Sequence, residues 1–286
     1  MTTPAGATAP FGARLAALTA ARGPLCVGID PHPGLLRQWG LSDDVDGLRT
    51  FALTCVEALG AGVAALKPQA AFFERHGSRG VAVLEEVVAG CRELGAACIV
   101  DAKRGDIGST MAAYADAFAG DASPLAGDAV TVSPYLGFGS LSPLLDLAAA
   151  TGRGVFVLAL TSNPEGPALQ HAVRADGRTV AQAVLDDVAA ANAGATPMGS
   201  VGVVVGATIG RDGETVHDLS AVNGPFLAPG IGAQGAGAQD LRRVFGDALG
   251  HVLPSSSREV LAGGPGVAGL REAAARTLDS VRDVLG

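Results

Sequence analysis

The sequence has 286 residues, 48% of them hydrophobic and 17% charged, which suits one large α/β domain with a substantial core. Its net charge of −8 and pI of about 5.1 exclude the basic surface by which proteins bind nucleic acid or anionic membranes. No apolar stretch is long enough to span a membrane, and the N-terminus lacks the basic start and apolar run of a signal peptide, so we expect a cytoplasmic protein.

Short apolar runs rich in Val, Ile and Leu recur along the whole chain. Continuous apolar runs of this length are typical of strands buried on both faces, as in a parallel sheet. The eight runs span residues 25–30, 63–68, 97–103, 129–135, 155–162, 202–208, 225–230 and 251–258. Segments with helical periodicity lie between them, most clearly at 49–62, 80–95, 181–193 and 273–285.

The alternation of strands and helices continues to the end of the chain, with no linker or charge block between two halves. It therefore predicts a single α/β domain over residues 1–286. Eight strand–helix units in this length favour a closed (β/α)8 barrel, the TIM barrel, and a doubly wound open sheet is the alternative. We expect residues 1–10 to form a flexible N-terminal tail, and we assign no role to residues 164–198.

Polar or special residues stand at the carboxyl end of nearly every predicted strand. In a barrel these ends converge on one mouth, where active sites are built. Turn chemistry explains Ser133 and Thr208 equally well. It does not explain charged residues there, because a buried charge is costly unless it is paired. The strand-end residues are Asp30, Lys67, Asp101, Lys103, Ser133, Ser162, Thr208, Gly230, Ser257 and Arg258.

The stretch DAKRGDI places four charges, Asp101, Lys103, Arg104 and Asp106, within six positions. Residues i and i+2 of a strand face the same side, so Asp101 and Lys103 are expected to point together into the barrel. Lys67, at the end of the neighbouring strand, is their expected partner, and Asp106 follows just past the strand. Two lysines and two aspartates cancel in charge, as a buried site requires. A charge-balanced network that only stabilises the barrel is the structural alternative.

This stretch closely resembles the D-x-K-x-x-D signature of the orotidine 5'-phosphate decarboxylase family, whose members make UMP from OMP. The resemblance covers about residues 25–258. CVGID resembles the family's first-strand aspartate motif, and LKPQAAFFE its second-strand lysine motif in the longer-chain bacterial (type 2) subfamily. TSNPEG, APGIGAQG and SSSR resemble later motifs of that subfamily, in the expected order. The resemblance implies a carboxy-lyase of de novo pyrimidine biosynthesis that uses neither a metal nor an organic cofactor.

The resemblance also implies roles for individual residues. It assigns a catalytic array to Lys67, Asp101, Lys103 and Asp106. In this array Lys103 is the proton donor to C6, and Asp101 lies beside the substrate carboxylate. The implied substrate-binding residues are Asp30, Ile107, Thr110, Ser162, Pro229, Gln234, Gly235, Ser257 and Arg258.

Among these, Asp30 and Lys67 are implied to hold ribose hydroxyls, and Ser162 to contact the pyrimidine. Gln234 and Arg258 are implied to bind the phosphate. In the family, the residues matching Asp106, Ile107 and Thr110 reach into the partner's site. The resemblance therefore implies a homodimer with shared active sites, whose only other partners are OMP and UMP.

The chemistry suits these residue types. Removal of CO2 from C6 leaves negative charge on a carbon with no electron sink, so fixed electrostatics must stabilise it. Lys103, expected between two carboxylates, should be protonated, because nearby opposite charges favour the charged form. It is then an acid and not a Schiff-base nucleophile, which argues against an aldolase on the same barrel.

Three alternative readings of the motifs remain open. The glycine-rich segment 230–237 suits phosphate binding after the seventh strand, but it also matches the G-x-G-x-x-G of an NADP-binding Rossmann unit. Only one strand follows it, which disfavours that unit. Metal-dependent sugar-phosphate decarboxylases share the D-x-K-x-x-D strand, and there Asp101 would help to bind Mg²⁺. A non-catalytic barrel that binds a nucleotide phosphate is the third alternative.

Cysteine and histidine residues show no pattern of a metal site. The four cysteines form no C-x-x-C pair and lie in apolar segments, so we expect buried free thiols and not disulfides or zinc ligands. The five histidines are scattered, without the spacing of metal ligands. We therefore predict no metal site.

Overall fold

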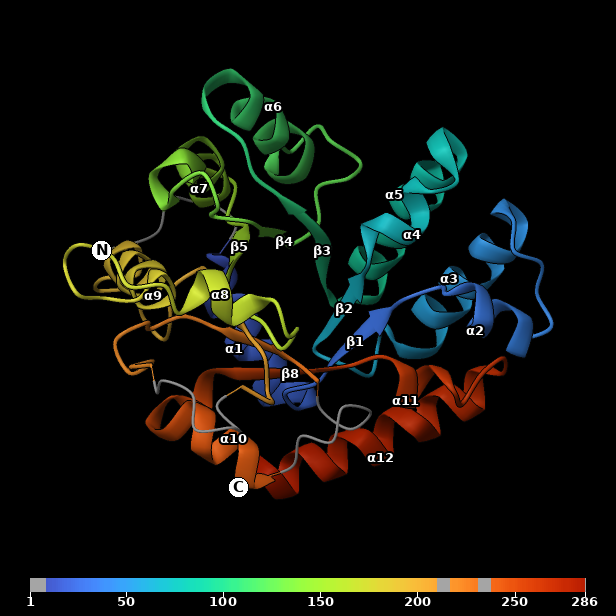
Figure 1. Ribbon diagram of the computed structural model, residues 1–286. Coiled ribbons are helices and arrows are strands. Elements are labelled where there is room, and N and C mark those ends of the chain that lie inside the picture. Colours follow the sequence, from blue (N-terminus) through green and yellow to red (C-terminus); the bar gives the residue numbers. More distant parts are fainter. Residues whose placement is uncertain (1–8, 210–216, 231–237, 286) are drawn as a thin grey trace.

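The computed structural model describes residues 9–209, 217–230 and 238–285. Over these residues, eight parallel strands form a closed barrel in which each strand pairs with the next and β8 pairs with β1 (Figure 1). The strands are β1 (Cys26–Ile29), β2 (Ala65–Pro68), β3 (Ala97–Arg104), β4 (Ala129–Val132), β5 (Gly154–Leu160), β6 (Val201–Val205), β7 (Phe226–Pro229) and β8 (Val252–Ser256). The predicted TIM barrel is confirmed, and the open sheet is not.

Most of the helices surround the barrel of strands (Figure 1). They are α1 (Phe11–Arg22), α2 (Pro33–Gln38), α3 (Val45–Leu59), α4 (Ala70–Glu74), α5 (Gly77–Leu94), α6 (Gly108–Ala119), α7 (Ser142–Ala150), α8 (Gly166–Gln170), α9 (Val180–Ala191), α10 (Ala238–Phe245), α11 (Arg258–Leu261) and α12 (Val267–Leu285), with the 3-10 helices η1 (Phe138–Leu141) and η2 (Gly246–His251). The four helices predicted from periodicity correspond to α3, α5, α9 and α12.

Local sequence signals set the ends of these helices. The side chain of Asp44 accepts a hydrogen bond from the backbone N–H of Gly47 at 2.9 Å and so caps the start of α3. Gly95 ends α5 with a φ of 73°, a conformation that glycine adopts without a steric penalty. A large apolar core fills the space between strands and helices, and outward-facing strand residues such as Val100 and Val130 belong to it.

Helix α1 seals the amino-terminal end of the barrel, which the sequence did not predict. Phe11 and Leu15 are buried against a second apolar cluster, made of inward-facing residues from all eight strands. The Phe11 ring packs edge-on against Phe156, with centroids 5.9 Å apart. Gly154 must lack a side chain, because a Cβ there would lie 2.1 Å from the Phe11 ring. In the described part of the chain, α1 therefore closes this end, and the carboxyl ends of the strands form the open end of the barrel.

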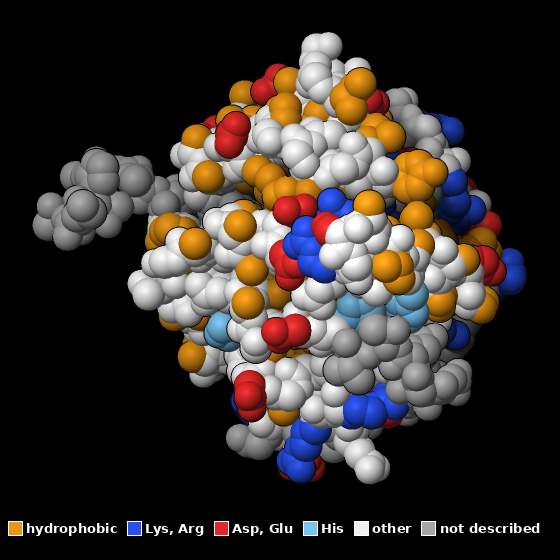
Figure 2. Space-filling view, turned by 60° about the vertical axis from the view of Figure 1, so that its left-hand side comes forward, with side chains coloured by type: hydrophobic (Ala, Val, Ile, Leu, Met, Phe, Trp, Pro, Cys, Tyr) orange, Lys and Arg blue, Asp and Glu red, His pale blue; other side chains and the backbone are white. Residues whose placement is uncertain are grey.

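The predicted tail at residues 1–10 lies outside the described residues except for Ala9 and Pro10, which are exposed. The four cysteines are free and buried, as predicted, and burial raises the pKa of Cys26 to about 12. Within the described ranges, no helix is both long enough and apolar enough to cross a membrane. On the face shown in Figure 2, acidic and basic side chains are interspersed.

Candidate active site

Asp101, near the carboxyl end of β3, is the centre of a charged cluster. Its Oδ2 accepts a hydrogen bond from Lys67 Nζ at 2.9 Å, and its Oδ1 accepts one from Lys103 Nζ at 2.6 Å. Lys67 and Asp101 are each only 7% exposed, whereas the Lys103 side chain is 44% exposed. One buried carboxylate therefore joins a buried ammonium group to one that faces the open end of the barrel.

Both buried members of the cluster are held in their charged forms. Burial by itself lowers the pKa of Lys67, but the carboxylates of Asp101 and Asp30 outweigh it and raise that pKa above its ordinary value. Burial by itself raises the pKa of Asp101, but Lys67 and Lys103 hold that pKa well below its usual range. Lys67 and Asp101 thus form a buried ion pair at neutral pH.

These two lysines are the only lysines in the chain, although Lys and Arg together number 20. Both contact the same carboxylate. Every side-chain amine of this protein is therefore committed to one site, and the rest of its positive charge is carried by arginine. This distribution also makes the site selectively visible to any method that reports on lysine.

Strand β3 is irregular where it carries the cluster. Its pairing with β4 is regular up to Val100 and resumes at Arg104, so residues 101–103 lie opposite a single residue of β4, Thr131. Lys103 has a φ of 48°, a left-handed conformation that is uncommon for a residue with a side chain. The predicted contact between the aspartate and the lysine is present. It is made within a bulged stretch and not within the regular strand from which it was predicted.

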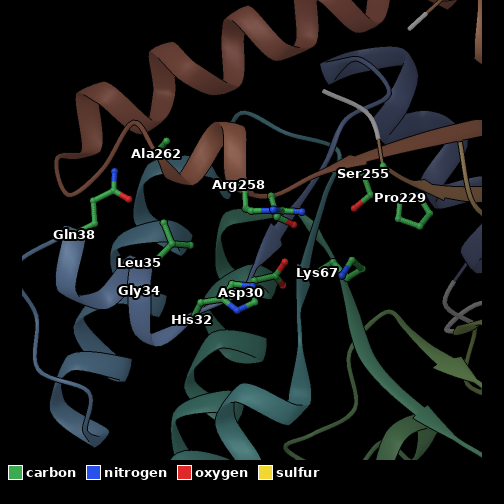
Figure 3. Close-up of a pocket in the computed structure, with 12 residues that line it drawn as sticks. Asp30, His32, Gly34, Leu35, Gln38, Lys67, Pro229, Ser255, Arg258 and Ala262 are labelled. Atoms are coloured by element: carbon green, nitrogen blue, oxygen red, sulfur yellow. The ribbon is translucent and has the colours of Figure 1, made fainter. Parts of the chain in front are cut away.

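A cleft of about 860 Å³ opens beside the cluster, at the carboxyl ends of β1, β2, β7 and β8 (Figure 3). Five of the predicted site residues line it, and Figure 3 shows four of them, from these strands and from α11, around one space. The predicted residues in the lining are Asp30, Lys67, Pro229, Ser257 and Arg258. The lining also includes Gly230, one of the predicted strand-end residues, and His32, Gly34, Leu35, Gln38, Ser255 and Ala262, which were not predicted as site residues.

Two polar groups in this cleft have hydrogen-bonding atoms without a partner among the described residues. Asp30 Oδ1 is buried and has no hydrogen-bond partner among the described residues. Arg258 is exposed at the start of α11, and its guanidinium makes no hydrogen bond or ion pair to any residue in the described ranges. Gly28 packs closely against Ser257 in the wall of the cleft. A side chain at position 28 would collide with it, because a Cβ there would lie 2.0 Å from Ser257 Oγ. A free guanidinium near a free carboxylate oxygen suits a ligand with both an anionic group and hydroxyl groups.

The second aspartate of the motif does not join the cluster within one chain. The carboxylate of Asp106 accepts a hydrogen bond from the backbone N–H of Ile107 at 2.8 Å, and in the described part of the chain it pairs with neither lysine. Ile107 is 61% exposed, and Thr110 is exposed in the first turn of α6. Ile107 and Thr110 are thus open to solvent in the single chain, and Asp106 is half-buried.

Ser162 follows β5 and lines a separate hollow of about 360 Å³ with Thr161, Gln170 and Thr208, among others. The structure therefore does not bring it into the wall of the larger cleft. The remaining predicted residues, Gln234 and Gly235, lie outside the described residues.

Comparison with known proteins agrees with these observations. Residues 23–273 match the Orotidine 5'-phosphate decarboxylase / HUMPS family. The chain belongs to this family. Orotidine 5'-phosphate decarboxylases of Salinispora arenicola and Streptomyces coelicolor are 66% and 61% identical to it, over 96% of this chain and 98% and 97% of theirs.

Solved structures give the same result. A Streptomyces avermitilis structure, described as a candidate orotidine 5'-phosphate decarboxylase, is 59% identical with a TM-score of 0.94, over 100% of this chain and 99% of its own. Leishmania donovani OMP decarboxylase is 30% identical with a TM-score of 0.75, over 96% of this chain and 98% of its own. These relatives support the decarboxylase reading of the motifs and give no support to the sugar-phosphate or non-catalytic alternatives.

Thr131 of this orotidine 5'-phosphate decarboxylase family member contacts the cluster but was not predicted from the sequence. Its hydroxyl donates a hydrogen bond to Asp101 Oδ1 at 2.8 Å and accepts one from the backbone N–H of Lys103 at 3.0 Å. Thr131 is 1% exposed. The available signal was a single hydroxyl within the otherwise apolar strand AVTV, at a position facing the barrel interior.

Arg104, the remaining charge of the decarboxylase motif DAKRGDI, stabilises the fold. The guanidinium of Arg104 pairs with Glu74 and lies over the rings of Tyr114 and Phe118, at 5.7 and 5.6 Å from their centroids. It therefore ties β3 to α4 and α6, on the outer side of the barrel and away from the cleft.

Proposed function

We propose that this chain converts OMP into UMP and CO2, a step of de novo pyrimidine biosynthesis, and that Lys103 is the acid. The bond between C6 and the carboxylate breaks, CO2 leaves, and the electron pair stays on C6, which then takes a proton from Lys103 Nζ. The observation that carries the proposal is the pairing of both lysines of the chain with one buried carboxylate beside the cleft. Such a biosynthetic enzyme is expected to act in the cytoplasm.

Fixed charge is the means of catalysis in this proposal. Loss of CO2 places negative charge on C6, and an ammonium group already held in position stabilises that charge without reorganisation. Asp101 holds Lys103, and Lys67 balances the charge of Asp101. Because the protein itself supplies the positive charge, we propose that neither a metal nor an organic cofactor takes part.

The cleft is proposed to bind the phosphate and the ribose of OMP. Arg258 and Gln234 bind the phosphate, and the unpartnered guanidinium of Arg258 supports its part in this. Asp30 and Lys67 bind ribose hydroxyls, which would give the buried Asp30 oxygen the donor that it lacks. The other proposed contacts are made by Pro229, Gly235, Ser257 and, to the pyrimidine, Ser162.

The proposed active form is a homodimer with shared sites. Asp106, Ile107 and Thr110 would complete the partner's site, which is supported by the exposure of Ile107 and Thr110 and by the absence of Asp106 from the cluster of its own chain within the residues described. Exposed Tyr135 and Leu136, in the loop after the neighbouring strand β4, would give such an interface apolar area.

Replacing Lys103 by arginine tests the acid role. The variant Lys103→Arg keeps a cation beside Asp101, but a guanidinium does not release its proton at neutral pH. Because general acid catalysis contributes about 10²- to 10⁴-fold, turnover of OMP should fall at least about 100-fold, with UMP affinity within about tenfold of wild type. OMP turnover and UMP binding are measured on the same preparations. Turnover close to that of wild type would show that Lys103 is not the acid.

A further inference from the structure

We propose that Thr131 is a positioning residue that fixes Lys103 relative to Asp101, and thereby the direction from which the proton reaches C6. The inference deepens the proposed function and rests on it. It concerns a residue of β4 that stands opposite the bulge of β3 and lies behind the cluster, at the barrel interior.

The hydroxyl of Thr131 contacts both residues that it would position, Lys103 and Asp101. It accepts a hydrogen bond from the backbone N–H of Lys103, so its own hydrogen is directed to Asp101 Oδ1, the oxygen that also accepts from Lys103 Nζ. One group therefore holds the backbone of the acid and the carboxylate that binds its ammonium. Hydrogen bonds linked in this way strengthen one another in a buried site.

The backbone of β3 shows why such a support is needed. Three residues, 101–103, lie opposite Thr131 alone, so the N–H of Lys103 has no carbonyl of a regular ladder to bond to. Lys103 also has its left-handed φ of 48°, and such a conformation persists only where the surroundings hold it. The Thr131 hydroxyl supplies the missing acceptor at that very residue.

Removal of this hydroxyl should affect catalysis more than folding. Asp101 would keep both lysines as partners, so the charges of the cluster stay balanced. The Thr131 backbone would keep its place in β4, where it pairs with Phe156 of β5. What is lost is the link between the carboxylate and the strained backbone, so the Lys103 ammonium would sample positions from which C6 is out of reach.

The test compares Thr131→Val, which keeps the shape but lacks the hydroxyl, with Thr131→Ser, which keeps the hydroxyl. Misplacement of a catalytic group by about 1 Å can cost about 100-fold, so kcat for OMP should fall about 10- to 100-fold in Thr131→Val. The KM for OMP and the Kd for UMP should stay within about threefold, because the cleft is unchanged, and Thr131→Ser should stay within about threefold in kcat. Thr277→Val is the matched control, since among the described residues the buried Thr277 hydroxyl bonds only to a carbonyl of its own helix, that of Ala273.

The outcomes separate this inference from the proposed function. A kcat of Thr131→Val equal to that of Thr277→Val, whatever its Tm, would overturn the positioning role. If Thr131→Val does not fold, Thr131→Ala and Thr131→Ser give the same comparison, because they differ only in the hydroxyl oxygen. Equal kcat for that pair would also overturn the inference. Absence of OMP turnover in the wild-type protein would instead contradict the proposed function.

Discussion

Asp101 is buried, and its charge would be unfavourable there without the two lysines that contact it. Its pKa in the folded state lies below that in the unfolded state, so the stability it contributes is present above about pH 3.9 and is lost as the pH falls through the folded pKa. The pKa of Lys67 is raised, so its contribution is present below about pH 10.4 and is lost as the pH rises through the folded pKa. The cluster is therefore most stabilising across the neutral range.

Lysine-selective NMR can measure this directly, because a chain with two lysines labelled with ¹³C at Cε gives two side-chain signals. The Lys67 signal should not titrate below about pH 10.4, and in Asp101→Asn it should titrate at a lower pH, because burial is then opposed by less negative charge. Lys67→Arg assigns the signals. A Lys67 signal that titrates at the same pH in wild type and Asp101→Asn would contradict the ion-pair account of the cluster.

The sequence predicted the composition of this cluster but not all of its geometry. A buried charge must be paired, so Lys67, Asp101 and Lys103 at neighbouring strand ends were expected to meet, and they do. Thr131 was missed because a threonine within an apolar strand is ordinary. Its importance depends on the register between β3 and β4, which no local pattern specifies.

At the scale of elements, the apolar runs identified all eight strands, and the polar residues at their ends indicated the mouth of the barrel. Continuous apolar runs identify the strands here because strands buried on both faces have few polar positions. Helix α1 was not predicted as a part of the barrel. Its function as a seal comes from contacts of Phe11 and Leu15 with residues far along the chain, which periodicity does not report.

The bulge of β3 is the second element that the sequence did not specify. A regular strand and a bulged strand can have the same pattern of apolar and polar residues, because the difference lies in the hydrogen bonds to the partner strand. Arg104 lies just past the bulge, on the outer side of the barrel, and pairs with Glu74. Of the four charges in this stretch, Asp101 and Lys103 thus belong to the charged cluster, whereas Arg104 supports the fold.

At the scale of the whole molecule, the net charge of −8 means that an anionic substrate must be attracted by local positive charge. Arg258 and the two lysines provide that charge beside the cleft. Within the single chain, Asp106 pairs with neither lysine among the described residues.

Mixed dimers test whether two chains complete one site. Lys103→Ala and Asp106→Ala should each be inactive as homodimers. After random exchange of subunits, half of the dimers are mixed and each has one intact site, so activity should return to about one quarter of wild type. Tagged subunits confirm that exchange has occurred. Verified mixed dimers without activity would contradict shared sites.

The central claim is that this chain decarboxylates OMP with its own charged residues. The most direct measurement is the ultraviolet absorbance of OMP with the purified protein, recorded with and without EDTA. The account predicts rapid loss of the orotate band at the same rate in both samples, with UMP as the product. Loss of the band only in the sample without EDTA, or in neither sample, would contradict it.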